Sequence, residues 1–169
     1  NSSATSGSTG VDIRAVVSAA SAGTITVQGT GGTGASSHGV RLSAGNLEGS
    51  LVSVNGNITV TGRAQDADID LDSNGGGLAR IEATGSGNVL VQSASAGGNV
   101  GIHFRNLGGT DTARIASGTG NVTLVADTMN FSGGNRVAAG GTLSIRPLTA
   151  GREIQLGVGA SDAASLALD

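Results

Sequence analysis

The sequence predicts an all-β protein whose chain winds into a parallel β-helix, also called a β-solenoid. Three observations support this prediction. A Gly-Asn-(Ile/Val) phrase recurs at a nearly constant interval, short apolar triplets alternate with polar residues, and glycine makes up 31 of the 169 residues. Short strands and glycine turns that repeat with a period of 31–33 residues are typical of a solenoid, in which each coil stacks on the next.

The recurring phrase sets the period. It appears at residues 56–58, 87–89 and 120–122, with looser copies at 23–25 and 151–154. The first apolar residues of successive copies are 33, 31, 33 and 32 residues apart. We expect these five residues to stack in one inward-facing core column, which consists of Ile25, Ile58, Val89, Val122 and Ile154.

Strand-like triplets bounded by Gly, Asn, Asp or Ser fill each period. Three triplets occur per period, which indicates a three-sided coil and about five coils of ~32 residues in a single domain, 1–169. Each strand is expected to pair in parallel with its copy one coil away, at a spacing of about 4.8 Å. The expected strands are 25–27, 40–42, 51–54, 58–60, 69–71, 79–83, 89–91, 101–104, 113–116, 122–126, 129–131, 143–145, 154–156 and 166–168, with a weaker one at 11–17.

Glycine and asparagine are predicted at the corners of the coil. Both residues tolerate the left-handed backbone region that sharp turns use. Asn57, Asn88 and Asn121 occupy equivalent positions, so they form either an amide ladder, each side chain bonding the next, or simply a set of good turn residues.

The composition excludes several functions. The net charge of −3, from nine arginines and twelve acidic residues, lacks the basic stripe of a nucleic-acid-binding protein. No run reaches the ~18 apolar residues of a membrane span. Without cysteine the chain has no disulfide and no thiolate metal site, which fits an extracellular protein stabilised by its strand ladders. The regular apolar triplets argue against disorder.

The densest charge cluster contains Asp66, Asp68, Asp70 and Asp72. Alternation puts the four carboxylates on one strand face, and the favoured interpretation is a solvated face that resists edge aggregation. Replacing Asp68 and Asp70 by asparagine is then expected to change stability little. The alternative is a calcium site, since Ca²⁺ binds several carboxylates, but Leu71 and Gly77 stand where an EF-hand loop needs Gly and Glu.

Neither histidine belongs to a recognisable site. His38 and His103 have no Cys and no second His nearby in the sequence, so a zinc site lacks ligands, and His103 is expected to face solvent. Seven arginines lie in or beside strands or corners, where they are expected to pair with acids or to form a solvated face: Arg41, Arg63, Arg80, Arg105, Arg114, Arg146 and Arg152. No catalytic residues and no cofactor are predicted.

Two segments carry a family resemblance. Residues 120–131 read GNVTLVADTMNF, and residues 141–157 read GTLSIRPLTAGREIQLG. This resembles the repeat region of filamentous-haemagglutinin-like giant exoproteins of Gram-negative bacteria, which belong to the two-partner secretion type. The resemblance implies a right-handed parallel β-helix, secretion through the outer membrane to the outside or the cell surface, and a role in adhesion or matrix formation.

The function predicted from the sequence is therefore a structural and adhesive repeat segment, a slice of a longer secreted chain, and not an enzyme. Its expected partners are neighbouring repeats or further copies end to end, and a host-cell or matrix surface. A subunit of a self-assembling extracellular fibre is the first alternative. A β-helical polysaccharide-active enzyme is the second, although the missing Trp, Tyr and Lys remove most of the residues that such a site uses.

Overall fold

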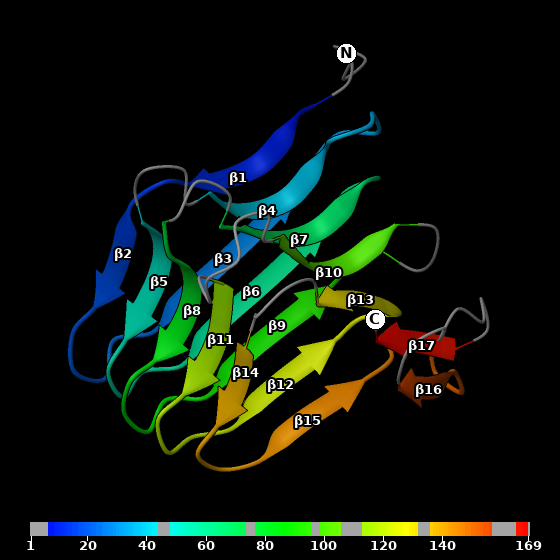
Figure 1. The fold of residues 1–169 in the computed structure, drawn as a ribbon. Helices are drawn as coiled ribbons and strands as arrows, with labels where there is room; N and C mark the ends of the chain where they lie inside the picture. The colour runs from blue at the N-terminus through cyan, green and yellow to red at the C-terminus, as the bar shows by residue number, and fades with distance from the viewer. Residues whose placement is uncertain are drawn as a thin grey trace.

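The computed structural model describes residues 7–43, 48–73, 77–95, 99–105, 113–131, 136–156 and 165–168. In these residues the chain forms β-strands and no helix, and it winds into a solenoid whose three sides are parallel sheets (Figure 1). The prediction of an all-β parallel solenoid is confirmed.

Each sheet collects every third strand, because the chain visits the three sides of the coil in turn. All described strand pairs are parallel. Sheet A contains, in spatial order, β1 (Thr9–Ile13), β4 (His38–Ser43), β7 (Ala67–Asp72), β10 (Val100–Arg105), β13 (Thr128–Phe131), β17 (Ser165–Leu168) and β16 (Glu153–Leu156). Sheet B contains β14 (Arg136–Ala139), β11 (Ala113–Ser117), β8 (Ala79–Ala83), β5 (Gly49–Ser53) and β2 (Val16–Ala19). Sheet C contains β15 (Leu143–Arg146), β12 (Val122–Val125), β9 (Val89–Ser93), β6 (Ile58–Arg63) and β3 (Ile25–Thr30).

Three coils are complete and paired on both sides: β4–β6, β7–β9 and β10–β12. The triplets β1–β3 and β13–β15 flank them. After β15 the three-sided order ends, since β16 and β17 both join sheet A and pair with each other. The doubly paired part of the solenoid is therefore about three turns, fewer than the five regular coils expected from the sequence.

An inward column of aliphatic side chains runs through sheet C. Each member is the register partner of the next and is less than a tenth exposed, because one coil shields the next from water. The members are Ile25, Ile58, Val89 and Val122.

The column then continues to Leu143 rather than to Ile154. Leu143 of β15 is the register partner of Val122, whereas Ile154 of β16 pairs with Leu166 in sheet A. The predicted place of Ile154 was therefore wrong. Only 21 residues separate Asn121 from Thr142, its hydrogen-bond partner in the following coil, so the last coil is shorter than the period that the sequence suggested.

Aliphatic residues supply most of the core, and two aromatic rings complete it in sheet A. Phe104 and Phe131 are register partners on β10 and β13. Their ring centroids lie 4.8 Å apart at an interplanar angle of 28°, so the two rings are stacked.

The glycine of the recurring phrase is required by the close approach of successive coils. A Cβ atom at Gly56 would lie 1.9 Å from the carbonyl oxygen of Gly23, and one at Gly87 would lie 2.0 Å from that of Gly56. The expected left-handed backbone is not found at these corners. Among the described residues, positive φ angles occur at Gly7, Ser21, Ser36 and Gly151.

Candidate functional site: the charged face of sheet A

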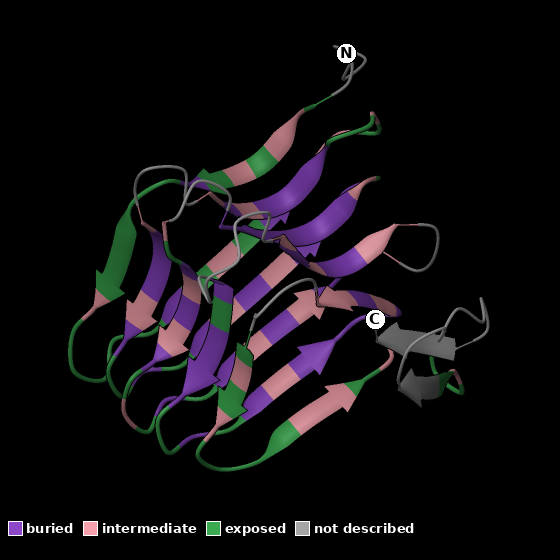
Figure 2. Ribbon diagram, in the orientation of Figure 1, coloured by how far each residue is buried: buried purple, intermediate pink, exposed green. Residues whose placement is uncertain are grey.

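The acidic strand β7 is buried on both of its faces (Figure 2). Ile69 and Leu71 belong to the apolar core, as the alternation predicts, and Ala67 is also buried. On the opposite face Asp68 and Asp70 are 0% exposed and Asp72 is 6% exposed. The prediction of a solvated acidic face was therefore wrong, because polar side chains of neighbouring segments cover these carboxylates.

Asp68 closes the corner between sheets C and A. Its Oδ1 accepts hydrogen bonds from the backbone N–H of Ala64 at 2.7 Å and from the Asn99 amide at 2.6 Å. Ser95 donates its hydroxyl to Oδ1 at 2.9 Å and its backbone N–H to Oδ2 at 3.1 Å, and the Ser93 hydroxyl also bonds Oδ2. Hydrogen bonds to an ionised acceptor are among the strongest in proteins, so Asp68 is an anchor of the fold.

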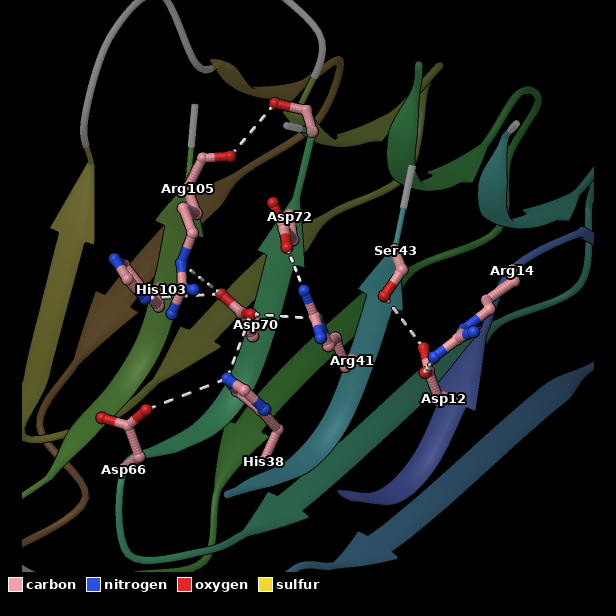
Figure 3. Close-up of polar contacts among 11 residues, drawn as sticks. Asp12, Arg14, His38, Arg41, Ser43, Asp66, Asp70, Asp72, His103 and Arg105 are labelled. Atoms are coloured by element: carbon pink, nitrogen blue, oxygen red, sulfur yellow. Dashed lines mark hydrogen bonds and ion pairs between the residues drawn. The ribbon is translucent and has the colours of Figure 1, made fainter. Parts of the chain in front are cut away.

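Asp70 occupies the centre of the charged face (Figure 3). Strand β4 presents His38 Nε2 at 3.3 Å and Arg41 Nε at 3.6 Å from its carboxylate. Strand β10 presents His103 Nδ1 at 3.4 Å and Arg105 Nε at 3.8 Å. Both carboxylate oxygens nevertheless lack a hydrogen-bond partner, so charge attraction rather than hydrogen bonding holds Asp70 in place.

Acidic and basic residues are neighbours across sheet A because its strands are in register. Asp12, Arg41 and Asp70 are successive partners on β1, β4 and β7, and the His103 imidazole follows on β10. Arg41 also forms a direct ion pair with Asp72 through Nη2. Opposite charges on directly opposed strand residues contribute roughly 0.2–1 kcal/mol each, so this row ties the strands of the face together.

Asp12 marks the first strand of the row. The Arg14 guanidinium donates a hydrogen bond to its carboxylate at 2.8 Å, and the Ser43 hydroxyl donates one at 2.9 Å. Burial opposes ionisation here, but these bonds outweigh it and lower the pKa of Asp12 below its ordinary value of 3.8.

His38 is buried beside Asp70 and is only 3% exposed. Its Nε2 atom lies 3.3 Å from Asp70 and 3.9 Å from Asp66, yet neither ring nitrogen has a hydrogen-bond partner. Burial lowers the pKa of His38 below its ordinary value of 6.5, while the Asp70 carboxylate opposes this shift. Arg41 and Arg105 lower the pKa of His38 further. The ring is therefore neutral at pH 7.

The structure brings together two histidines that the sequence analysis treated as isolated. His38 and His103 approach the same carboxylate from opposite sides, and the His103 side chain is 19% exposed rather than facing solvent freely. Part of this arrangement follows the repeat. Asp70 and His103 are register partners 33 residues apart, which matches the period of the core column. His38 is not a register partner of Asp70, because β4 and β7 pair at an offset of 29 residues, as Arg41 and Asp70 do.

The four aspartates proposed as a weak calcium site are not brought together. The Asp66 side chain is 42% exposed, Asp68 turns to the corner, Asp70 faces the imidazoles and Asp72 pairs with Arg41. Within the described residues, no group of three or more His, Asp or Glu side chains is arranged to hold a metal ion.

The asparagines of the recurring phrase form a ladder along one corner. The Asn88 backbone N–H donates to Asn57 Oδ1 at 2.8 Å, and the Asn121 N–H donates to Asn88 Oδ1 at 2.9 Å. The Thr142 N–H donates to Asn121 Oδ1 at 2.8 Å. Each side chain therefore bonds the backbone of the next coil rather than the next amide side chain.

Arginines also line the outer face of sheet B. Arg80, Arg114 and Arg136 are register partners on β8, β11 and β14. Arg80 pairs with Glu48 at 2.6 Å and with Glu82 at 3.4 Å, and Arg114 pairs with Glu82 at 3.4 Å. Such partly exposed pairs contribute at most about 1 kcal/mol each. Arginines thus pair with acids on sheet B as well as on sheet A.

Asp127 anchors the turn after β15, which contains part of the sequence that carries the family resemblance. Thr149 donates its backbone N–H to Asp127 Oδ1 at 2.8 Å and its hydroxyl to Oδ2 at 2.5 Å. Arg152 Nη1 lies 3.8 Å from Oδ2. Burial raises the pKa of Asp127, but these partners outweigh it and bring the pKa below 3.8.

The chain matches no protein-family model, no curated protein and no solved structure. In the part of the chain that the structure describes, no helix is long and apolar enough to cross a bilayer. The chemistry of the charged face therefore has to be argued from its geometry. Because Asp68, Asp70 and His38 are closed off from water, this geometry favours holding β4, β7 and β10 together over acting on a substrate.

Proposed function

We propose that this chain is a structural and adhesive segment of a secreted or cell-surface exoprotein, in which stacked coils form an extended rod. The observation that carries the proposal is that an apolar side chain at the end of a column is exposed at each end of the solenoid, in sheet B at one end and in sheet C at the other. Val17 in β2 is 45% exposed and Leu143 in β15 is 43% exposed, whereas their inner partners Leu51 and Val122 are 0% exposed. A further coil at either end would cover these side chains, so the fold is suited to extension.

The resemblance to filamentous-haemagglutinin-like exoproteins supports this proposal. It rests on residues 120–131 and 141–157, whose described part, up to residue 156, forms strands and turns. Right-handed winding is part of the proposal, since parallel crossover connections are right-handed in about 98% of cases. The partners would be neighbouring repeats of the same chain and a host-cell or matrix surface.

Surface labelling tests this function. Antibodies raised against the folded segment should label the outside of intact producing cells or their extracellular matrix, and gold labels should follow thin filaments in electron micrographs. Labelling that appears only after lysis, or on compact particles, would contradict the proposal. Antibodies raised against the unfolded chain are the control for recognition of the folded coils.

The same open ends favour a second candidate, a subunit that assembles end to end into a fibre. Sedimentation velocity at rising concentration should then show elongated oligomers. Val17→Arg and Leu143→Arg should abolish them, because a charge at a column end blocks stacking. Val54→Arg is the matched control, since Val54 is 42% exposed but belongs to neither column end. A strictly monomeric wild-type segment would exclude assembly from separate copies.

We also propose that the segment has no catalytic activity. The buried carboxylates of the charged face cannot reach a substrate without opening the sheet. Incubation with neutral and acidic polysaccharides should release no new reducing ends and no unsaturated products. Turnover that His103→Gln abolishes would instead favour the polysaccharide-active alternative.

A further inference from the structure

His38 is a buried ring that the hydrogen bonds of the fold do not use. It is 3% exposed, and both of its ring nitrogens lack a hydrogen-bond partner. A buried polar group in this condition is costly and calls for an explanation. We propose that His38 is an acid-sensitive latch, whose neutral ring closes the outer face of sheet A and whose protonation opens this face around β4, β7 and β10.

The groups around the His38 ring explain why its protonation would open the face. On its own strand it faces Arg41, while the turn before β7 presents Asp66 and strand β7 presents Asp70. Strand β10 presents Arg105 to the ring and His103 to the far side of Asp70. The adjoining strand β1 places the uncharged Thr9 opposite the ring. A proton on His38 would add a cation to a site where the guanidinium groups of Arg41 and Arg105 already lie beside the Asp70 carboxylate.

Opening of the face would remove two unfavourable features, the burial of a charged ring and the missing hydrogen bonds of Asp70. Water would solvate the charged ring, and it would also reach the two oxygens of Asp70 that have no hydrogen bond in the closed face. The inward columns beneath are apolar and contain no titratable group. Acid therefore acts on β4, β7 and β10 of sheet A, and the strands of sheets B and C stay paired.

The direction of the pH dependence follows because His38 binds a proton more weakly in the folded chain than in the unfolded chain. Burial lowers the pKa of His38 in the folded chain below the ordinary value of 6.5. The stabilisation that comes from the neutral ring is therefore complete above pH 6.5 and is lost as the pH falls towards the lower folded value. The opening should thus appear in mildly acidic solution.

Amide hydrogen exchange at pH 7.5 and pH 5.0 tests the latch, with rates corrected for the intrinsic pH dependence of exchange. For each unit by which the pKa is lowered, acid should speed opening of β4, β7 and β10 by up to about tenfold. Amides of sheet B serve as the internal reference. His38→Gln should remove the difference between the sheets, because glutamine takes up no proton.

Two further variants and one direct titration make the test decisive. His103→Gln is the matched control, and it should retain the acid response because its partly exposed ring is not the latch. Asp66→Asn should increase the response, since it removes a carboxylate that favours the charged ring. The titration of the His38 ring in the unmodified protein, followed by nuclear magnetic resonance, should have its midpoint below pH 6.5.

Three results would overturn the proposal. The first is an acid response of equal size in all three sheets. The second is a response that persists in His38→Gln. The third is a His38 ring that titrates at or above its ordinary value of 6.5, which needs no variant to measure.

Discussion

Strands β7 and β9 belong to the same coil, yet their outer faces differ. Every residue of β7 is buried, whereas β9 alternates between buried and half-buried residues (Figure 2). The difference lies in the flanking coils. Asp70 has Arg41 and His103 as its register partners, and these long side chains cover it. The corresponding neighbours of Leu90 on β9 are two threonines, which are too short to cover a neighbouring strand.

The comparison shows that the burial of an outward-facing side chain on a parallel solenoid depends on the side chains of its register partners in the neighbouring coils. A carboxylate taken out of water destabilises a fold unless it is paired or hydrogen-bonded. Asp68 meets this condition with hydrogen-bond donors, and Asp70 meets it with the nearby charges of Arg41 and Arg105. Sheet C avoids the problem because its outer face carries no acidic residue.

The largest expected effect concerns the inner face of β9. Val89→Asp should destabilise the protein by more than about 4 kcal/mol or prevent folding, because an unpaired charge would replace a fully packed side chain. Urea unfolding followed by circular dichroism gives the midpoint. Leu90→Asp, on the half-buried outer face of the same strand, is the control and should cost much less. Equal losses in the two variants would contradict the assigned faces.

The outer face of β7 should come second. Asp68→Asn removes the negative charge that several donors share and should destabilise the fold by about 2–4 kcal/mol. The measurement is the same urea midpoint. Asp66→Asn is the control, because that side chain is 42% exposed and should change the midpoint little. If Asp68→Asn were as mild as the control, the buried anchor at this corner would be disproved.

A smaller effect is expected at the asparagine ladder. Asn88→Ala leaves the Asn121 N–H without its acceptor at an exposed corner, where water replaces the bond, so the loss should be about 0.5–1.5 kcal/mol. Thermal unfolding of the variant measures it. Asn88→Asp keeps an acceptor oxygen and should recover most of the loss. A variant with alanine that melts like wild type would mean that the ladder is only a consequence of the turn.

The smallest effect is a dependence on acid at Asp127. Its pKa in the folded chain lies below 3.8, so its contribution is present above that pH and is lost as the pH falls through the folded value. Urea midpoints between pH 5 and pH 2.5 should therefore fall less steeply in Asp127→Asn than in wild type. An unchanged slope would show that Thr149 and Arg152 do not stabilise the ionised form.

Sequence reasoning could reach the inward columns because each position asks only for an apolar side chain at a fixed spacing. Ile58, Val89 and Val122 can be recognised because each directly follows a Gly-Asn pair. The method failed at Ile154 because the last coil is shorter, and the phrase at 151–154 lies beyond the strand that completes the column. A period estimated from earlier coils cannot reveal such a deletion.

The outer face was harder to predict because it depends on the register between distant strands. In the sequence alone, the aspartates of β7 look like a solvent-facing row, because only the register with β4 and β10 brings Arg41 and His103 beside them. The 33-residue spacing of Asp70 and His103 matches the period, but Arg41 and Asp70 are only 29 residues apart, so the period does not place Arg41 beside Asp70. The tilt of the His38 ring towards Asp66 and Asp70 did not follow from spacing, since its own register partner is Ala67.

The parallel ladders have a mechanical consequence. Their hydrogen bonds run along the axis of the stack, from each coil to the next, so a pull on the two ends loads all three sheets together. A middle coil can leave only if two sets of ladders break, whereas an outermost coil has to break one. Under tension such a stack would therefore fray from its tips, and the interior turns would be the last to yield.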